Sequence, residues 1–258
     1  MKEENNTANS QERQKLLAYL RSAKELFVII SMHTRMPFVF CDPETFDDEV
    51  LLYKTEEEAQ KGGKLLLARK DPVNIAKLEN RHLLSFYSNL FTMGVNAMAI
   101  NKGLEDETHL QLGELVKRPD MDNLPDGKKW VENPQFHLTA LYFMQQMRKD
   151  PEQQMTEELK EMQEELLVDL QRGKYLLPVE PDKGLLVMKQ KDGSVFQPVF
   201  TDSDEFRKFN RENKYRTAVV EYAKLPDILP PEAKGVIVNP LGVNIPFHIA
   251  RPKKTETK

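Results

Sequence analysis

The chain has 258 residues, of which 40% are hydrophobic and 8% aromatic, and its formal net charge is −4. A chain of this size and composition can bury a stable core, as one domain or as two. The acidic balance argues against nucleic-acid binding, which needs a concentrated basic face. The single cysteine, Cys41, excludes an internal disulfide framework and is typical of a reducing compartment, so we expect a cytoplasmic protein.

The two ends of the chain are polar, and we expect residues 1–10 and 252–258 to be disordered tails because they carry too little apolar surface to bury. The acidic, amide-rich start does not resemble a secretory signal. The longest dense apolar run, Leu26 to Met32, is far shorter than the roughly 20 residues that span a bilayer. We therefore expect no membrane partner.

The first half begins with an amphipathic helix over residues 11–24, for which Ser10 is a suitable N-cap. Thr55 and Glu58 have the spacing of a capping box, which predicts a helix that ends at Gly62–Gly63. A longer amphipathic helix is predicted near residues 83–91. Short β-branched or apolar runs predict strands at Leu26–Ile30, Val50–Tyr53, Leu65–Ala68 and Ala97–Asn101.

The composition changes between residues 120 and 132, where Asp, Asn, Pro, Gly and Lys predict a linker. Asn133–Pro134 then predicts a helix start, and a second helix follows from about Thr156. Asp192–Gly193 predicts a hairpin, and Thr201 or Ser203 is a suitable cap for the next helix. Strands are predicted at Phe196–Phe200, Thr217–Tyr222 and Gly235–Asn239.

The two halves repeat one order of elements: helix, strand, capped helix, strand, and a last strand that ends in Asn101 or Asn239. Leu16–Leu26 also aligns with Leu166–Leu176, although leucine matches between amphipathic helices arise easily. The sequence therefore predicts an internal repeat.

Three ordered blocks in the second half, Tyr175–Val179, Phe196–Asp202 and Gly235–Gly242, resemble the N-terminal domain of the SseB family, named for enhanced serine sensitivity. The resemblance implies an α+β module with a mixed sheet flanked by helices. It supplies no reaction, cofactor or catalytic residue. The domains expected are a diverged SseB-like module at 11–119, a linker at 120–132 and an SseB N-terminal-like module at 133–251. In the diverged copy, Lys102 and Gly103 follow Asn101 where the second copy has Pro240.

The sequence contains none of the common phosphate-binding, nucleophile-elbow or zinc-protease motifs, which favours a protein without catalytic activity. Cys41, at the end of a strand-like run, is expected to pack as a small hydrophobe facing the core. The five histidines lack partners at zinc-site spacing, so we expect no metal and no cofactor. Asp106, Glu107 and His109 are expected to be solvated surface residues.

The candidate binding residues lie in the loops that follow the last strand of each half: Asn101, Lys102, Gly103, Asn239, Pro240 and Gly242. Asn, Gly and Pro there also fix turns, which is the more ordinary explanation. We expect a non-catalytic cytosolic binding or scaffolding protein, with a protein partner or self-association. The alternative is a binder of, or an enzyme acting on, an amino-acid-related small molecule, with its pocket between the two modules.

Overall fold

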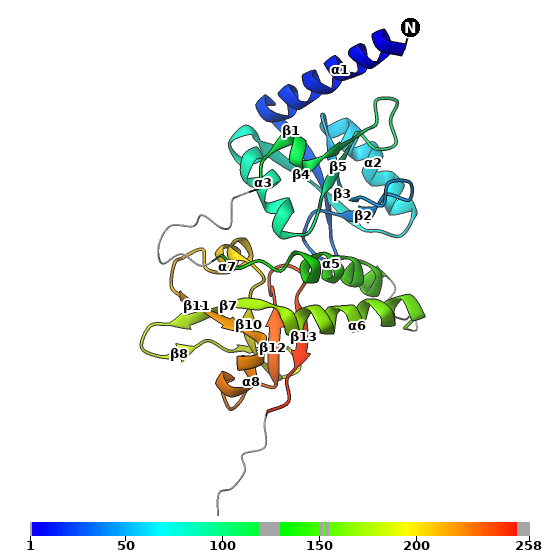
Figure 1. Cartoon of the computed structure of the whole chain (residues 1–258). Helices are drawn as coiled ribbons and strands as arrows, with labels where there is room; N and C mark the ends of the chain where they lie inside the picture. Colours follow the sequence, from blue (N-terminus) through cyan, green and yellow to red (C-terminus); the bar gives the residue numbers. More distant parts are fainter. Residues whose placement is uncertain (1, 119–129, 150–151, 153–154, 252–258) are drawn as a thin grey trace, which may run out of the picture. The chain divides into compact units, whose positions relative to one another are not determined.

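A computed structural model describes residues 2–118, 130–149, 152 and 155–251 (Figure 1). The chain divides into two compact units, Met1–Met32 with Pro37–Asp120, and His33–Met36 with Met121–Lys258. Most of the predicted linker at 120–132, and the predicted tail at 252–258, lie outside the described residues.

The first unit contains one mixed sheet with strand order β4-β1-β3-β5-β6, and β2 pairs with β3. Strands β3 and β5 are parallel, and the other neighbours are antiparallel. The elements are α1 (Lys2–Ser22), β1 (Glu25–Ser31), β2 (Val39–Cys41), β3 (Asp48–Tyr53), α2 (Glu56–Ala68), β4 (Val73–Glu79), α3 (Asn80–Thr92), β5 (Ala97–Ile100), β6 (Thr108–Gln111) and α4 (Leu112–Leu115).

Helices cover both faces of this sheet, and Figure 1 shows α2 and α3 on opposite sides of the strands. Leu51 and Tyr53 pack with Leu66 of α2 in one hydrophobic cluster. Because side chains alternate along a strand, Val50 and Leu52 are buried on the opposite face. On that face the Tyr87 hydroxyl donates to the Leu20 carbonyl at 3.0 Å, which ties α3 to α1.

Two helices differ from the sequence-based prediction. Helix α1 starts at Lys2 and includes Ser10, so residues 2–10 are helical rather than a disordered tail. No glycine or proline interrupts that segment, and extending an existing helix is far easier than nucleating one. Helix α2 has the predicted Thr55–Glu58 capping box but continues through Gly62–Gly63 to Ala68, so the predicted strand at Leu65–Ala68 is wrong.

The second unit contains a four-stranded sheet, β13-β12-β10-β9, and a three-stranded sheet, β11-β7-β8. Leu176 of β7 and Phe200, just after β10, exchange backbone hydrogen bonds of 2.9 and 3.0 Å between the two sheets. The elements are α5 (Pro134–Lys149), α6 (Glu157–Arg172), β7 (Lys174–Glu180), β8 (Gly184–Leu185), β9 (Met188–Lys189), β10 (Val195–Val199), α7 (Ser203–Phe209), β11 (Arg216–Glu221), η1 (Tyr222–Lys224), α8 (Leu225–Ile228), β12 (Gly235–Val238) and β13 (Ile245–His248).

The predicted starts of helices in the second unit are largely confirmed. Pro134 is the first residue of α5, and Thr156 caps α6 by accepting from the Leu159 amide. For α7 the N-cap is Asp202 rather than Thr201 or Ser203. A carboxylate accepts two amides at once, here those of Asp204 and Glu205, which a hydroxyl does less well.

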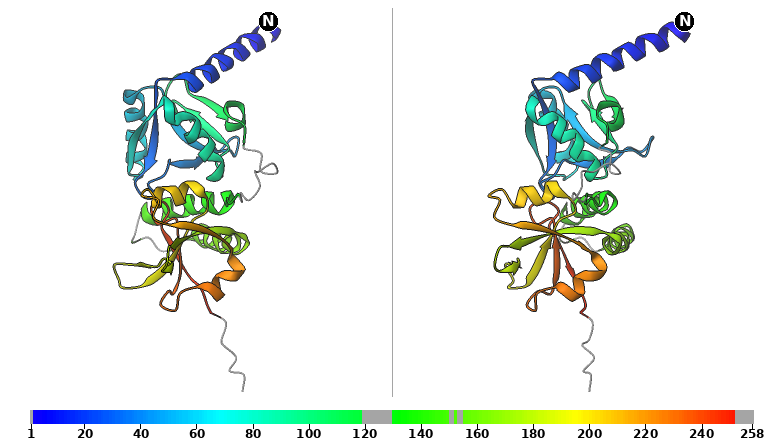
Figure 2. Two further views of the ribbon diagram at one scale, coloured as in Figure 1. Left: turned by 90° about the vertical axis from the view of Figure 1, so that its left-hand side faces the viewer. Right: turned by 60° about the vertical axis from the view of Figure 1, so that its left-hand side comes forward.

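The two units use the same order of neighbouring strands. In each, a first strand (β1 or β7) pairs antiparallel with the strand that follows the capped helix (β4 or β11). A second strand (β3 or β10) pairs parallel with a later one (β5 or β12), which continues antiparallel to the last (β6 or β13). Both units are mixed α+β folds, and Figure 2 shows the strands of each from two further directions.

Candidate functional site

Asn101 and Asn239, the two asparagines predicted to end the last strands, are both fully buried and both have positive φ, 54° and 45°. The Asn101 Oδ1 accepts from the Lys54 amide at 3.1 Å, and the Asn239 Oδ1 accepts from the Thr201 amide at 3.0 Å. Each side chain therefore stabilises, by a hydrogen bond, the turn that leads into the capped helix. Neither is free to contact a ligand.

The loop after Asn239 forms a compact turn, in which the Gly242 amide donates to the Asn239 carbonyl at 2.9 Å. The Asn239 Nδ2 donates to the Thr201 hydroxyl at 2.8 Å. Pro240 and Gly242 line neither of the two cavities described below. In the second unit, the candidate loop therefore has an evident structural role.

Lys102 and Gly103, from the corresponding loop of the first unit, line a cavity of about 310 Å³. Its walls come from β2, β3, the last turns of α2 and the loop between β5 and β6. The lining residues are Phe38, Phe40, Leu51, Tyr53, Gly62, Leu65, Leu66, Arg69, Asp71, Lys102, Gly103 and Glu107. The cavity thus joins an aromatic and aliphatic wall to charged groups of both signs.

Lys102 is held at this cavity by several contacts. Its ammonium lies 4.7 Å from the centre of the Phe40 ring and 3.1 Å from the Glu107 carboxylate. The Tyr53 hydroxyl donates to the Lys102 carbonyl at 3.1 Å. Burial raises the pKa of Tyr53 to about 12, so the hydroxyl stays protonated and keeps this hydrogen bond at neutral pH.

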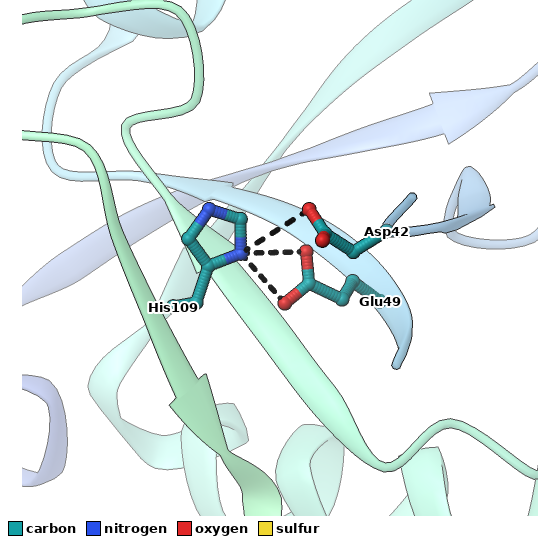
Figure 3. A group of neighbouring side chains, drawn as sticks. All are labelled: Asp42, Glu49 and His109. Atoms are coloured by element: carbon teal, nitrogen blue, oxygen red, sulfur yellow. Dashed lines mark hydrogen bonds and ion pairs between the residues drawn. The ribbon is translucent and has the colours of Figure 1, made fainter. Parts of the chain in front are cut away.

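Next to the cavity, Asp42, Glu49 and His109 point toward one another from three separate segments (Figure 3). The His109 Nδ1 lies 2.8 and 2.9 Å from the two oxygens of Glu49 and 4.0 Å from the Asp42 Oδ2. The other ring nitrogen, Nε2, lies 3.1 Å from the Glu107 carboxylate. Lys102 also approaches, 3.7 Å from the Asp42 Oδ2.

The sheet explains why these residues meet. Glu49 of β3 is opposite Ala97 of β5, and His109 of β6 is opposite Ala99. Alternating residues share one face, so all four side chains lie on the face that α2 covers. The two alanines leave room for the His109 ring to cross β5 and reach Glu49.

The charges of this cluster are coupled. Burial raises the pKa of the Glu49 carboxyl, and hydrogen bonding by His109 only partly opposes this. Hydrogen bonds from the Thr45 and Glu44 amides lower the pKa of Asp42. Burial lowers the pKa of His109, but hydrogen bonds and charges from Glu49 and Glu107 outweigh burial and raise it.

Three sequence-based expectations change here. Cys41, the last residue of β2, is exposed rather than facing the core, whereas Val39, two residues earlier on the same face of the strand, is buried. Burial and nearby carboxylates raise the pKa of its thiol, which opposes reactivity. Glu107 and His109 are partners in a defined cluster, not independent solvated groups. Asp106 binds Lys54 at 2.6 Å and the Asn101 amide at 3.0 Å.

Sequence reasoning missed Asp42 and Glu49 because their partners are distant in the chain. Glu49 carries one available signal, since it is a carboxylate within a strand whose next four residues are all apolar, Val50–Tyr53. A buried carboxylate needs a partner, but the sequence does not identify which histidine supplies it.

A second cavity, of about 350 Å³, lies within the second unit among α5, α6 and β13. It is mainly apolar and includes Met144, Met147 and Met155, with Arg148 and Gln163 as polar members. Among the described residues, its lining carries no carboxylate. It therefore offers much less recognition chemistry than the cavity beside Lys102.

The second unit is thus an α+β module with a mixed strand order and helices on its faces. Residues 152–250 match the family model described as SseB protein N-terminal domain. The match confirms the resemblance found in the second half of the sequence. The Asp42, Glu49 and His109 cluster lies outside the matched residues.

Among solved structures, the chain is similar to Tic22 from Plasmodium falciparum, with 15% identity, 84% of this chain and 89% of that chain covered, and a TM-score of 0.22. It is also similar to Anabaena Tic22 (protein transport), with 14% identity, 86% and 91% covered, and a TM-score of 0.20. At these TM-scores, no conclusion about function follows. No curated protein matches the sequence. Within the described residues, no helix has the length and apolar character needed to cross a membrane.

Proposed function

We propose that the protein is a non-catalytic binding protein and that its first unit binds a small zwitterion, such as an amino acid with an apolar side chain. The observation that carries the proposal is the cavity of about 310 Å³ beside Lys102. Ligand pockets are typically 300–1,000 Å³, with an apolar lining and a few well-placed polar groups. This cavity has the size and the lining for a small member of that class.

The lining residues have the charges that a zwitterion requires. Lys102 and Arg69 are donors for a carboxylate, and Glu107 and Asp71 are acceptors for an ammonium group. Phe38 and Phe40 offer an apolar surface for the ligand's side chain. Because Lys102 and Glu107 are 3.1 Å apart, the ligand would exchange one internal ion pair for two of its own.

We also propose that the two units are diverged copies of one module. Shared strand order supports this, and so do equivalent positions. Leu52 and Val199 pair with the residues just before Asn101 and Asn239, and the N-caps Thr55 and Asp202 each follow three residues later. The two asparagines also accept from equivalent backbone amides, those of Lys54 and Thr201. Under this alignment, Phe196 and Pro246 replace Glu49 and His109, so only the first copy carries the polar cluster.

For location, we propose the cytoplasm. The single cysteine, Cys41, supports a reducing compartment. Fractionation of the native cell with a tag on the chain tests this directly, and recovery of the tagged protein outside the cytoplasmic fraction would contradict it.

Thermal and urea unfolding of the full chain with a panel of amino acids tests the binding function. A ligand at 100 times its dissociation constant should stabilise the fold by about 2.7 kcal/mol. The variants Phe40→Ala and Lys102→Met should remove that gain. Lys64→Met, on the exposed side of α2 and outside the cavity lining, is the matched control and should retain it.

Two matched analogues sharpen the test. One keeps the apolar side chain and carboxylate but lacks the ammonium group, and the other keeps the ammonium group but lacks the carboxylate. Both should bind more weakly than the amino acid. Absence of stabilisation by every amino acid at millimolar concentration would refute the proposed function.

A further inference from the structure

We infer that Asp42, Glu49 and His109 form a binding site for one divalent transition-metal ion. This site goes beyond the proposed zwitterion cavity and also departs from the expectation, based on histidine spacing alone, that the chain binds no metal.

The first support is distance. One ligand atom from each of the three residues can be chosen so that all lie within 4.8 Å of one another. A metal bound by nitrogen and carboxylate oxygen at about 2.0–2.2 Å brings its donors roughly 3 Å apart. The His109 Nδ1 is 2.8 Å from the Glu49 Oε1, so those two donors already have nearly that separation. Asp42, at 4.0 Å from the same nitrogen, needs a shift of about 1 Å.

The second support is the orientation of the histidine ring. The Nε2 of His109 lies 3.1 Å from the Glu107 carboxylate, which can only accept a hydrogen bond when ionised. A proton on Nε2 leaves a lone pair on Nδ1 when the ring is neutral, and this lone pair faces Glu49. A carboxylate behind the second ring nitrogen is the usual arrangement for a metal-binding histidine.

The third support is charge. Glu49 is completely buried and Asp42 is nearly so, with relative exposures of 0% and 7%. Buried carboxylates are stable when paired or bound to metal. Among the described residues, Lys102 is the permanent cation that forms an ion pair within 4.0 Å of these two carboxylates, and His109 is their other partner. Three acidic groups, counting Glu107, thus surround one lysine and one histidine.

The Asp42 carboxylate is already oriented for coordination. Its Oδ1 accepts from the Glu44 amide at 2.9 Å and the Thr45 amide at 3.1 Å. These bonds fix the side chain and leave Oδ2 directed at His109 and Lys102. Binding of an ion displaces the Lys102 ammonium from Oδ2, which its contacts with Phe40 and Glu107 can accommodate.

The donor set selects the class of metal. Ca²⁺ and Mg²⁺ prefer oxygen ligands alone, whereas an imidazole with two carboxylates suits Zn²⁺, Mn²⁺ or Fe²⁺. The His109 side chain is 34% exposed, so solvent can supply the remaining ligand. Three protein ligands leave one position of a tetrahedral ion open to water or to another small ligand.

The test uses the full chain after treatment with a chelator, titrated calorimetrically with zinc chloride and, separately, manganese chloride. We expect one ion per chain for at least one of these metals. His109→Gln and Asp42→Asn should each weaken metal binding at least about 100-fold. Residues that only hydrogen-bond to a metal ligand typically cost 10- to 100-fold when they are changed. Asp42→Asn retains the Oδ1 acceptor for the two amides, so it keeps the loop intact. Glu107→Gln should weaken binding by about tenfold.

His82→Gln and Cys41→Ser are the matched controls, because His82 is exposed on α3 and Cys41 is the only thiol. Both should bind as the unchanged chain does, and circular dichroism should confirm that each variant is folded. If His109→Gln fails to fold, the metal affinity of Asp42→Asn alone tests the site. The inference is overturned if neither metal binds in the micromolar range, if magnesium chloride binds equally well, or if the folded ligand variants bind with unchanged affinity.

Zinc or manganese binding is measured without any amino acid present. Metal binding without amino-acid binding would support this site and refute the proposed function. Amino-acid binding without metal binding would support the proposed function and refute this site.

Discussion

Gly62 of α2 lies directly against the ring of Tyr53 of β3, so closely that a Cβ added at Gly62 would stand 1.9 Å from the Tyr53 hydroxyl oxygen. The absence of a side chain allows α2 to approach the sheet, and Tyr53 then reaches the Lys102 carbonyl at 3.1 Å. This contact joins the packing of the first unit to the wall of its cavity.

Gly62→Ala should therefore destabilise the protein by roughly 1–3 kcal/mol, the usual range for overpacking. Gly113→Ala is the control, because a Cβ there meets nothing within 4 Å and alanine favours a helix. Urea unfolding followed by circular dichroism measures both. Equal stability of the two variants would show that α2 does not pack on Tyr53 as described.

The capping box of α2 should behave as a coupled pair. The Glu58 amide donates to the Thr55 hydroxyl at 3.2 Å, and the Glu58 carboxylate accepts from the Thr55 amide at 2.9 Å. Thr55→Ala should cost about 1 kcal/mol. Because the Thr55 hydroxyl also donates to the Glu58 carboxylate at 2.9 Å, the double variant Thr55→Ala/Glu58→Ala should cost less than the sum of the single variants. Strict additivity of unfolding free energies would contradict the reciprocal cap.

Asp202 should make the second unit sensitive to acid. Its carboxylate accepts from the Asp204 and Glu205 amides and lies 3.4 Å from the buried His137. Burial raises the pKa of Asp202, but hydrogen bonding by His137, its charge and the other donors outweigh burial, and the pKa lies below its ordinary value of 3.8. Because the pKa of Asp202 is lower in the folded state than in the unfolded state, the ionised carboxylate stabilises the fold when the pH is above the unfolded-state pKa. This stabilisation is lost as the pH falls through the folded-state pKa.

Stability should therefore drop as the pH falls below about 4, near the unfolded value for Asp. Asp202→Asn should lower the free energy of unfolding by roughly 1.5–3 kcal/mol at pH 7, as expected for hydrogen bonds to a charged group. The stability of this variant should also change less than that of the unchanged chain as the pH falls. Asp227→Asn, at an exposed position, is the control. Urea unfolding at pH 7 and at several values down to pH 3 measures the effect. A parallel pH profile for Asp202→Asn and the unchanged chain would contradict this role.

Asn239 combines a positive φ of 45° with two buried hydrogen bonds to Thr201. Asn239→Ala puts a less tolerant residue at the positive φ and leaves the buried Thr201 amide without its acceptor, so it should cost about 2–6 kcal/mol, since strain and an unsatisfied buried donor each cost about 1–3 kcal/mol. Asn239→Gly removes the strain alone and should restore part of that loss. Thermal unfolding of the two variants separates the contributions. If glycine is no better than alanine, backbone strain does not explain the choice of asparagine.

The sequence predicted features that depend on neighbours in the chain. The Thr55–Glu58 capping box and the buried strand β1 are examples, because their signals lie within a few residues. It failed at Gly62, where glycine usually signals a helix end but here allows close packing on Tyr53. Tertiary packing decided that position, and the misplaced strand at Leu65–Ala68 followed from the same error.

The candidate site was harder to predict for a similar reason. Lys102 and Gly103 were singled out because they follow a strand, and they do line the cavity. Asp42, Glu49 and His109 come from three separate segments, and only the pairing of β3 with β5 and of β5 with β6 brings two of them together. That pairing is a long-range property that no local pattern in the chain specifies.

The most direct test of ligand binding by the first unit is a two-dimensional NMR titration of the full chain with L-leucine, using assigned backbone amides. We predict saturable shift changes at residues around the cavity, including Phe40, Tyr53 and Lys102, and none around Asn239. The Lys102→Met variant should abolish them. No saturable change, or changes confined to the second unit, would contradict the proposal that the cavity beside Lys102 is the binding site.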